Sequence, residues 1–149
     1  MNLLKRVSLV IYFSILLYIV FFAQRRQAIA WNVEMINVVP FRNTINSYYS
    51  LNDVGWLNFS SNLFGNILLF IPFPFFIIEF FEIFKKKLII GIGIFTSFLI
   101  EFLQYIFRIG IPDIDDVLFN TSGVIAGVIL WKTLFKTKHT KEKSNSFRL

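Results

Sequence analysis

Cysteine is absent from the 149 residues, and histidine occurs once, as His139. The missing thiols exclude disulfides, thiolate nucleophiles and cysteine-bound metals. His139 lies in a polar stretch near the C-terminus, away from other potential ligands, so histidine catalysis is not indicated. Charged residues make up only 16% of the chain, and nine are acidic.

Apolar residues dominate the composition instead. They are 56% of the chain, with 20 Phe, which is more apolar surface than a soluble domain of this size can bury. A helix needs about 20 apolar residues to cross a hydrocarbon core of about 30 Å. Four continuous runs approach that length, too few for a barrel of alternating strands. We predict an all-α membrane protein with four transmembrane helices, at about 7–23, 63–78, 88–107 and 117–135.

These runs define one transmembrane domain over residues 1–136, with a long outer loop at 24–61 and a basic tail at 137–149. The first run also has a rival interpretation as a cleaved signal peptide, because Ala28–Ala30 resembles a cleavage site. The run is longer than a usual signal-peptide core, however, and Arg25 and Arg26 stand between it and that site. We expect it to remain as a helix.

The distribution of Lys and Arg predicts the orientation. Eleven of the fifteen lie at the two termini and in the turn of Lys85–Lys87. The other four, in the remaining connections, are Arg25, Arg26, Arg42 and Arg108. Because Lys and Arg accumulate on the cytoplasmic side, we predict that both termini are cytoplasmic. The positive charge thus reflects topology, and no nucleic-acid binding is expected. The basic stretch from Lys132 to Arg148 is either a solvated, disordered tail or a segment attracted to anionic lipid headgroups.

The outer loop carries several large aromatic side chains. They are Trp31, Tyr48, Tyr49 and Trp56. Such side chains favour the membrane–water interface. The loop therefore either lies on the membrane surface or is a plain connector with incidental aromatics.

Polar residues inside the third run fall on one stripe. Glu101, Gln104 and Arg108 have helical spacing, and Gly93 and Ser97 continue the stripe inward. Ionisable groups within a membrane are costly and usually face the interior of a bundle. Small residues at four-residue spacing also let another helix approach closely. We expect this stripe to face the other helices.

The fourth and second runs carry similar polar groups. Asp116 and Asn120 precede a G-x-x-x-G pattern, Gly123 and Gly127, which is typical of helix contact. In the second run Asn66 lies near the outer end, as does Asn62. Pro72 should kink that run and free backbone carbonyls.

Helix rise places these polar groups at similar depths in the outer leaflet. We expect five of them to converge around one outward-facing cavity. The alternative is that they only cap helix ends and satisfy one another. The five residues are Asn66, Glu101, Gln104, Asp116 and Asn120.

Four carboxylates are expected near that cavity, and the nearest cation is Arg108. They are Glu101, Asp113, Asp115 and Asp116. Their repulsion can be relieved by a divalent cation, by a carboxyl that stays protonated as an acid, or by pairing with Arg108 and Arg42. Negative charge at the start of the fourth helix also suits its dipole.

Four pieces of sequence, in this order and spacing, carry a family resemblance. They are Asn37–Arg42 (NVVPFR), Asn66–Phe73 (NILLFIPF), Glu101–Gln104 (EFLQ) and Asp113–Gly123 (DIDDVLFNTSG). From about residue 37 to 130 the chain resembles the VanZ-like family of small bacterial membrane proteins. It departs from the family pattern at Pro74, where a glycine is usual, and at Arg108, which lies further from the aspartates than the family's arginine.

The resemblance implies a cell-envelope role in the cytoplasmic membrane, with lowered susceptibility to teicoplanin-type glycopeptide antibiotics. One hypothesis is a non-catalytic protein whose outward pocket binds the antibiotic or an envelope component such as a lipid-linked cell-wall precursor. Another is an intramembrane enzyme with Glu101 or Asp116 as general acid or base. A third is an accessory subunit of a larger complex. The candidate binding residues are Arg42, Asn66, Gln104, Arg108, Asp113, Asp115 and Asn120. No cofactor is identified and no residue is assigned as a metal ligand.

Overall fold

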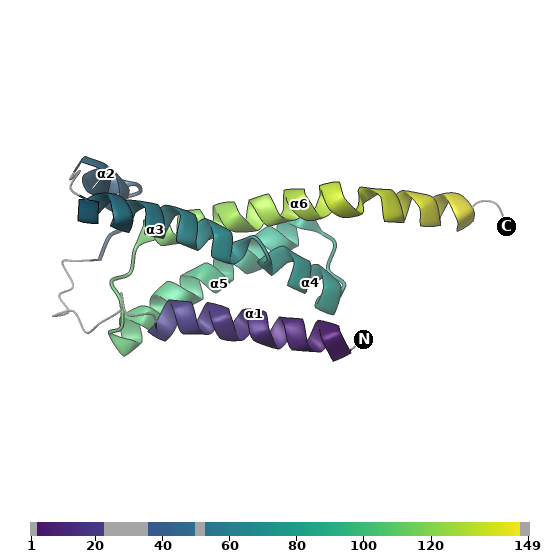
Figure 1. Cartoon of the computed structure of the whole chain (residues 1–149), viewed down its shortest axis with the longest axis horizontal. Helices are drawn as coiled ribbons and strands as arrows, with labels where there is room; N and C mark the ends of the chain where they lie inside the picture. The colour runs from purple at the N-terminus through teal and green to yellow at the C-terminus, as the bar shows by residue number, and fades with distance from the viewer. Residues whose placement is uncertain (1–2, 23–35, 50–52, 147–149) are drawn as a thin grey trace.

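A computed structural model describes residues 3–22, 36–49 and 53–146, but not the side chains of 53–55, 57–58, 61 and 136–146. The expected loop features at Arg25, Arg26, Ala28–Ala30 and Trp31 lie outside the described residues. The described elements are all helical, as predicted (Figure 1). The helices are α1 (Leu3–Phe22), α2 (Arg42–Tyr49), α3 (Asp53–Phe70), α4 (Phe73–Phe81), α5 (Lys86–Phe107) and α6 (Ile114–Ser146).

Within the described residues, four stretches are long and apolar enough to cross a membrane, which confirms the predicted number. Both chain ends lie at one end of the bundle, as an even number of crossings requires (Figure 1). We call this the terminal end, and the opposite one, near α2, the α2 end. The stretches are Leu3–Phe22, Asn62–Phe81, Lys86–Phe107 and Ile114–Phe135.

The second crossing is broken at Pro72, where the kink was expected. Pro72 has no N–H to donate, so α3 ends at Phe70, and the Pro72 carbonyl accepts bonds from Phe75 N and Phe76 N at 3.0 and 3.4 Å to begin α4. Pro74 follows in the first turn of α4, where no N–H is needed. Before this crossing, the segment expected as a loop holds α2 and the first turns of α3.

Helix α6 lies against α3, α4 and α5. The two glycines of α6 lie directly against the backbone of the α3–α4 stretch. A Cβ at Gly123 would collide with the carbonyl oxygen of Ile67, and one at Gly127 would collide with that of Ile71. Side chains any larger would push the helices apart. The G-x-x-x-G pattern is thus a packing surface.

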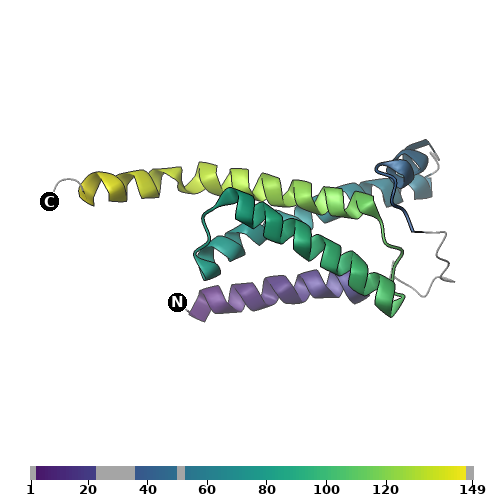
Figure 2. The same cartoon turned by 180° about the vertical axis from the view of Figure 1, so that it is seen from behind.

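Helix α1 lies at the edge of the bundle, with α5 between it and α6 (Figures 1 and 2). Its attachments are individual side chains. The Tyr12 hydroxyl donates to the Leu69 carbonyl at 3.0 Å, and its ring stacks on Phe76 with 4.6 Å between centroids. Lys5 forms an ion pair with Glu79 at the terminal end. Most other α1 side chains are exposed, as expected for a surface that faces lipid.

Candidate functional site

The α5–α6 turn lies at the α2 end of the bundle. Helix α5 ends where Arg108 adopts a left-handed conformation, with φ 53°. The Ile109 N–H then donates to the Gln104 carbonyl at 3.1 Å, which closes the helix. The exposed Arg108 therefore belongs to the turn and not to the polar stripe of α5.

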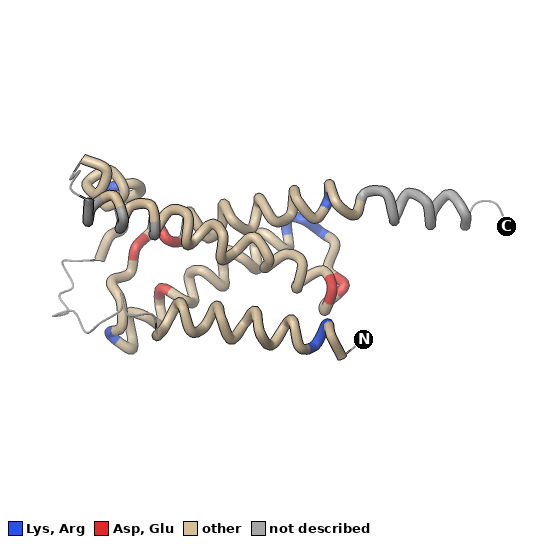
Figure 3. The backbone as a smooth tube through the Cα atoms, in the orientation of Figure 1, with Lys and Arg blue, Asp and Glu red and all other residues tan. Residues whose placement is uncertain are grey.

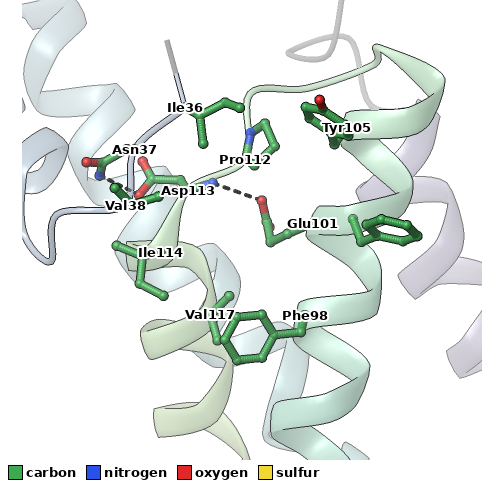
Figure 4. A pocket seen from close by; sticks show the side chains of 11 residues that line it. Ile36, Asn37, Val38, Phe98, Glu101, Tyr105, Pro112, Asp113, Ile114 and Val117 are labelled. Carbon is green, nitrogen blue, oxygen red and sulfur yellow. Dashed lines mark hydrogen bonds between the residues drawn. The ribbon is translucent and has the colours of Figure 1, made fainter. Parts of the chain in front are cut away.

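A short extended segment around Asn37 is hydrogen-bonded to this turn. Asn37 N donates to the Pro112 carbonyl at 3.0 Å, and Ile114 N donates to the Asn37 carbonyl at 2.9 Å. The Asn37 side chain adds a bond to Asp113 Oδ1 at 2.7 Å. These three bonds join residues far apart in sequence and fix the segment over the start of α6 (Figure 4).

Asp115 fastens the beginning of α2 in the same region. Its carboxylate accepts from Phe41 N, from Thr44 N at 3.3 Å and from the Thr44 hydroxyl at 2.7 Å. These N–H groups flank the first turn of α2, which has no partner for them within the helix. Asp115, only 2% exposed, therefore acts as an N-terminal cap supplied from another helix, where negative charge is favoured.

Asp113 connects this cap to α5. Its Oδ1 accepts from Asp115 N at 2.9 Å, and its Oδ2 accepts from the Asn43 amide at 2.7 Å. Its own N–H donates to Glu101 Oε2 at 3.0 Å. Glu101 is 6% exposed and faces the bundle, as expected. Asp113 therefore contacts each neighbouring acidic residue through a backbone N–H group. Its own N–H donates to Glu101, and the N–H of Asp115 donates to Asp113.

The sequence left three ways to relieve the repulsion among the acidic residues: a divalent cation, a protonated carboxyl, or pairing with arginine. Among the described residues, no group of three or more His, Asp or Glu side chains is placed to hold a metal ion. Arg42 is exposed at the start of α2. Amide, hydroxyl and backbone donors therefore account for the stabilisation of Asp113 and Asp115.

A cavity of about 270 Å³ opens between α5, the beginning of α6 and the Asn37 segment. We call it the α5–α6 cavity. Asn37, Glu101, Tyr105 and Asp113 are among the lining residues (Figure 4), but the exposed wall of the cavity is almost entirely apolar. Its apolar lining includes Ile36, Val38, Phe98, Phe102, Ile114 and Val117. For comparison, an apolar cavity of about 150 Å³ holds a benzene molecule.

Asp116 and Asn66 lie away from this cavity. The Asn66 amide donates to Asp116 Oδ1 at 2.7 Å and ties α3 to α6. Asp116 lines a separate polar pocket of about 20 Å³, together with Asn62 and Asp115. That volume is about the size of one water molecule.

Asn120 and Gln104 are buried and make other contacts. The Asn120 amide donates to Ser97 Oγ at 2.8 Å between α6 and α5, and its Oδ1 has no hydrogen-bond partner in the described part of the chain. Gln104 donates to the Val20 carbonyl at 3.1 Å in the last turn of α1. The five residues expected around one cavity are thus distributed over separate contacts, and of the five only Glu101 lines the α5–α6 cavity.

Comparison with known proteins places the chain in a family. A family model described as VanZ/LLP1 matches residues 9–136. The chain belongs to the VanZ/LLP1 family. The match includes most of α1 and extends beyond the resemblance seen between about 37 and 130. No curated protein and no solved structure gives a significant match.

In this VanZ/LLP1 membrane protein, the four family-like pieces meet in space. The first piece provides Asn37 and Phe41, which bind the aspartates of the fourth piece. Asn66 of the second piece also binds that piece, at Asp116, and Glu101 of the third accepts from the Asp113 N–H. The pieces therefore form one polar network at the α2 end.

Several residues that make these contacts were not predicted as site residues. They are Asn37, Asn43, Thr44 and Ser97. Asn37 begins the first family-like piece, and Ser97 was identified only as part of a packing stripe. Asn43 and Thr44 directly follow Arg42, but nothing in the local pattern distinguishes them from ordinary loop residues.

Proposed function

We propose that this protein acts in the cell envelope from the cytoplasmic membrane and lowers susceptibility to teicoplanin-type glycopeptide antibiotics. It does so by binding an amphipathic molecule in the α5–α6 cavity, either the antibiotic or the lipid-linked wall precursor near which the antibiotic acts. The observation that carries this proposal is the cavity itself, about 270 Å³ with largely apolar walls and the buried carboxyl-bearing Glu101. Membership of the VanZ/LLP1 family supports the envelope role.

The proposal requires the cavity to face outward. Eleven of the fifteen Lys and Arg lie in the termini and the Lys85–Lys87 turn, which the positive-inside rule assigns to the cytoplasm. The cavity lies at the opposite, α2 end, beside the α5–α6 turn. A molecule in the outer leaflet would reach it without crossing the membrane.

The lining suits an amphipathic ligand. Phe98 and Val117 line the cavity within the membrane-spanning parts of α5 and α6, whereas Asn37 and Asp113 line it near the turn. An apolar group of the ligand would therefore fill the cavity, and the ligand's polar part would remain outside it, toward the turn. Because hydrogen bonds fix Asn37 to Asp113, this wall is held in place before a ligand arrives.

Growth in teicoplanin tests this proposal with two adjacent positions. Val38 lines the cavity and Val39 does not, and both side chains are exposed. Val38→Trp should fill the cavity and abolish protection, whereas Val39→Trp should retain it at equal membrane levels. Equal protection by the two variants would contradict a binding role for the cavity.

A second candidate function is an intramembrane enzyme in which Glu101 is a general acid or base on a lipid-linked substrate. The buried position of Glu101 in the cavity lining favours it. Asp116, the other candidate, lines the small polar pocket instead. The two candidates would therefore act from different places.

Glu101→Gln separates binding from catalysis, with Asp116→Asn as a comparison outside the cavity. Protection that survives Glu101→Gln at equal membrane level would eliminate Glu101 as the acid or base of such an enzyme, and protection that also survives Asp116→Asn would eliminate the enzyme. Protection lost together with a change in the lipid-linked precursors, measured by mass spectrometry of lipid extracts, would support it. Protection lost while the lipids stay unchanged would instead support a charged binding site.

A further inference from the structure

The α5–α6 cavity opens sideways, along a stripe of aromatic side chains on α5. Phe98, Phe102 and Tyr105 have helical spacing, so they share one face of the helix, and all three line the cavity. All three are also exposed at the surface of the bundle, Phe98 by 51% and Phe102 by 57%. Because Phe98 and Phe102 lie within the membrane-spanning stretch Lys86–Phe107, the mouth of the cavity opens onto the lipid around the bundle.

Charge does not interrupt this side of α5. Between Leu88 and Phe107 the one charged residue is Glu101, and its side chain is buried. Figure 3 shows the acidic and basic positions toward the two ends of the bundle, with an uncharged length between them. Charged groups exposed to hydrocarbon are costly. The surface around the mouth is therefore suited to direct contact with lipid chains.

The mouth is elongated along the helix. Phe98 and Tyr105 are about 10 Å apart along the axis of α5, and Figure 4 shows Phe98 and Val117 at one end of the cavity and Tyr105 and Ile36 at the other. Helices that span a membrane tilt on average by only about 20° from the bilayer normal, which is also the mean direction of lipid chains. A chain that lies beside α5 thus has the direction of the mouth.

The polar residues of the lining are hydrogen-bonded to one another. Glu101 accepts from Asp113 N at 3.0 Å, and Asp113 Oδ1 accepts from the Asn37 amide at 2.7 Å. The wall that stays exposed inside the cavity is almost entirely apolar. A lipid headgroup inside it would lose its hydrogen bonds to water without replacing them. The cavity therefore suits the chain of a lipid, and the headgroup remains outside, toward the α5–α6 turn.

The volume of the cavity admits a single chain. About 270 Å³ is less than twice the roughly 150 Å³ of a cavity that holds one benzene molecule. A glycerophospholipid has two chains held side by side, and one of them would have to stay outside. A lipid with one chain has no such conflict.

We propose that the cavity holds the hydrocarbon chain of the lipid-linked cell-wall precursor, which enters sideways from the outer leaflet. This inference rests on the proposed function and decides between its two ligands. The precursor resides in the leaflet onto which the mouth opens, whereas the antibiotic arrives from the aqueous side. Because the chain leaves one apolar environment for another, the gain comes from van der Waals contact with walls that otherwise have no partner.

Photo-crosslinking of the full chain in vesicles tests this proposal. The probe is a polyprenyl phosphate with a diazirine on its chain, and the crosslinked residues are mapped by mass spectrometry. Phe98 lines the cavity and Leu99 does not, although they are neighbours at nearly the same depth and both are exposed. Labelling of Phe98 should saturate as probe is added, whereas labelling of Leu99 should rise in proportion to the probe. Proportional labelling at both positions would overturn the proposal.

Two variants and two competitors define the site. Val38→Trp should lower the labelling of Phe98 to that of Leu99, and Val39→Trp should leave it unchanged, because only Val38 lines the cavity. Equal labelling of Phe98 in the two variants would count against the proposal. Excess unlabelled polyprenyl phosphate should displace the probe, and phosphatidylglycerol at the same excess should not. Equal displacement by both lipids would also overturn the proposal, because the cavity would then accept any lipid chain.

The results separate this inference from the proposed function. If labelling of Phe98 does not saturate while Val38→Trp abolishes protection against teicoplanin, this inference is wrong and the proposed function stands with the antibiotic as ligand. If labelling of Phe98 saturates while Val38→Trp retains protection, the cavity binds the precursor chain and the proposed function is wrong.

Discussion

Helices α6 and α1 are both long and apolar enough to span a membrane, but they are held by different kinds of contact. Helix α6 meets α3 and α4 at glycines that touch carbonyl oxygens, so its position is fixed by the backbone. Helix α1 is held by side chains, through Tyr12, Gln104 and Lys5. Backbone contact tolerates no added atom, whereas a single side-chain hydrogen bond within a membrane contributes only about 0.6 kcal/mol. The difference indicates that the packing of α6 against α3 and α4 is the rigid part of the fold.

The rigid part is also the part that forms the site. The α5–α6 cavity is lined by α5, the start of α6 and the Asn37 segment, with no described residue of α1. Asp113, Asp115 and Asp116 all belong to the first residues of α6 or the turn before it. A tightly packed α6 therefore determines where these carboxylates lie, and α1 covers the other side of α5.

The largest predicted effect is at Gly127. Gly127→Ala places a methyl group against the Ile71 carbonyl, and relief of the overlap should cost about 3 kcal/mol. Gly91→Ala is the matched control, because nothing lies within 4 Å of a Cβ there. We expect chemical unfolding in detergent to show a large loss for the first variant and equal or slightly higher stability for the second. Equal stability of the two would refute backbone contact as the basis of α6 packing.

A smaller effect is expected at the Asp115 cap. Asp115→Asn replaces one of two acceptor oxygens, so contacts to Phe41 N or Thr44 are lost, at a cost of about 2 kcal/mol. Proteolysis near residues 36–44 should become faster. Glu82→Gln, exposed at the other end of the bundle, is the control and should change nothing measurable. Unchanged proteolysis in Asp115→Asn would mean that the α2 cap is not needed to hold the segment.

The smallest effect is expected at the α1 attachments. Gln104→Leu removes the bond to the Val20 carbonyl, and Tyr12→Phe removes the bond to Leu69 while it keeps the ring stack. Each should lower stability by about 1 kcal/mol or less. Hydrogen exchange should accelerate in α1 and not in α6. Faster exchange in both helices would show that α1 is as integral to the fold as α6.

The sequence predicted the architecture well because hydrophobic length and Pro72 are local signals. The four stretches of membrane-spanning length and the break at Pro72 are all present in the described residues. Helices α2 and the start of α3 were not predicted, because their residues are too polar to appear as part of a transmembrane run. The placement of α2 depends on Asp115, which is more than seventy residues away along the chain.

The site was harder to predict because helical spacing indicates which way a side chain points but not which residue it contacts. Glu101 and Gln104 differ by about 60° around α5, and that is enough for one to face the α5–α6 cavity and the other to face α1. Arg108 leaves the stripe because α5 ends just before it. The link between Asn37 and Asp113 arises only from tertiary packing, so no local pattern could indicate it.

The central claim, that the α5–α6 cavity faces outward, is tested most directly by thiol labelling, since the chain has no cysteine of its own. Val38→Cys introduces a thiol at the cavity, and Lys87→Cys introduces one at the terminal end. A membrane-impermeant maleimide added to intact cells should label Val38→Cys, and should label Lys87→Cys only after the cells are permeabilised. The reverse pattern would contradict the claim, because the cavity would then face the cytoplasm.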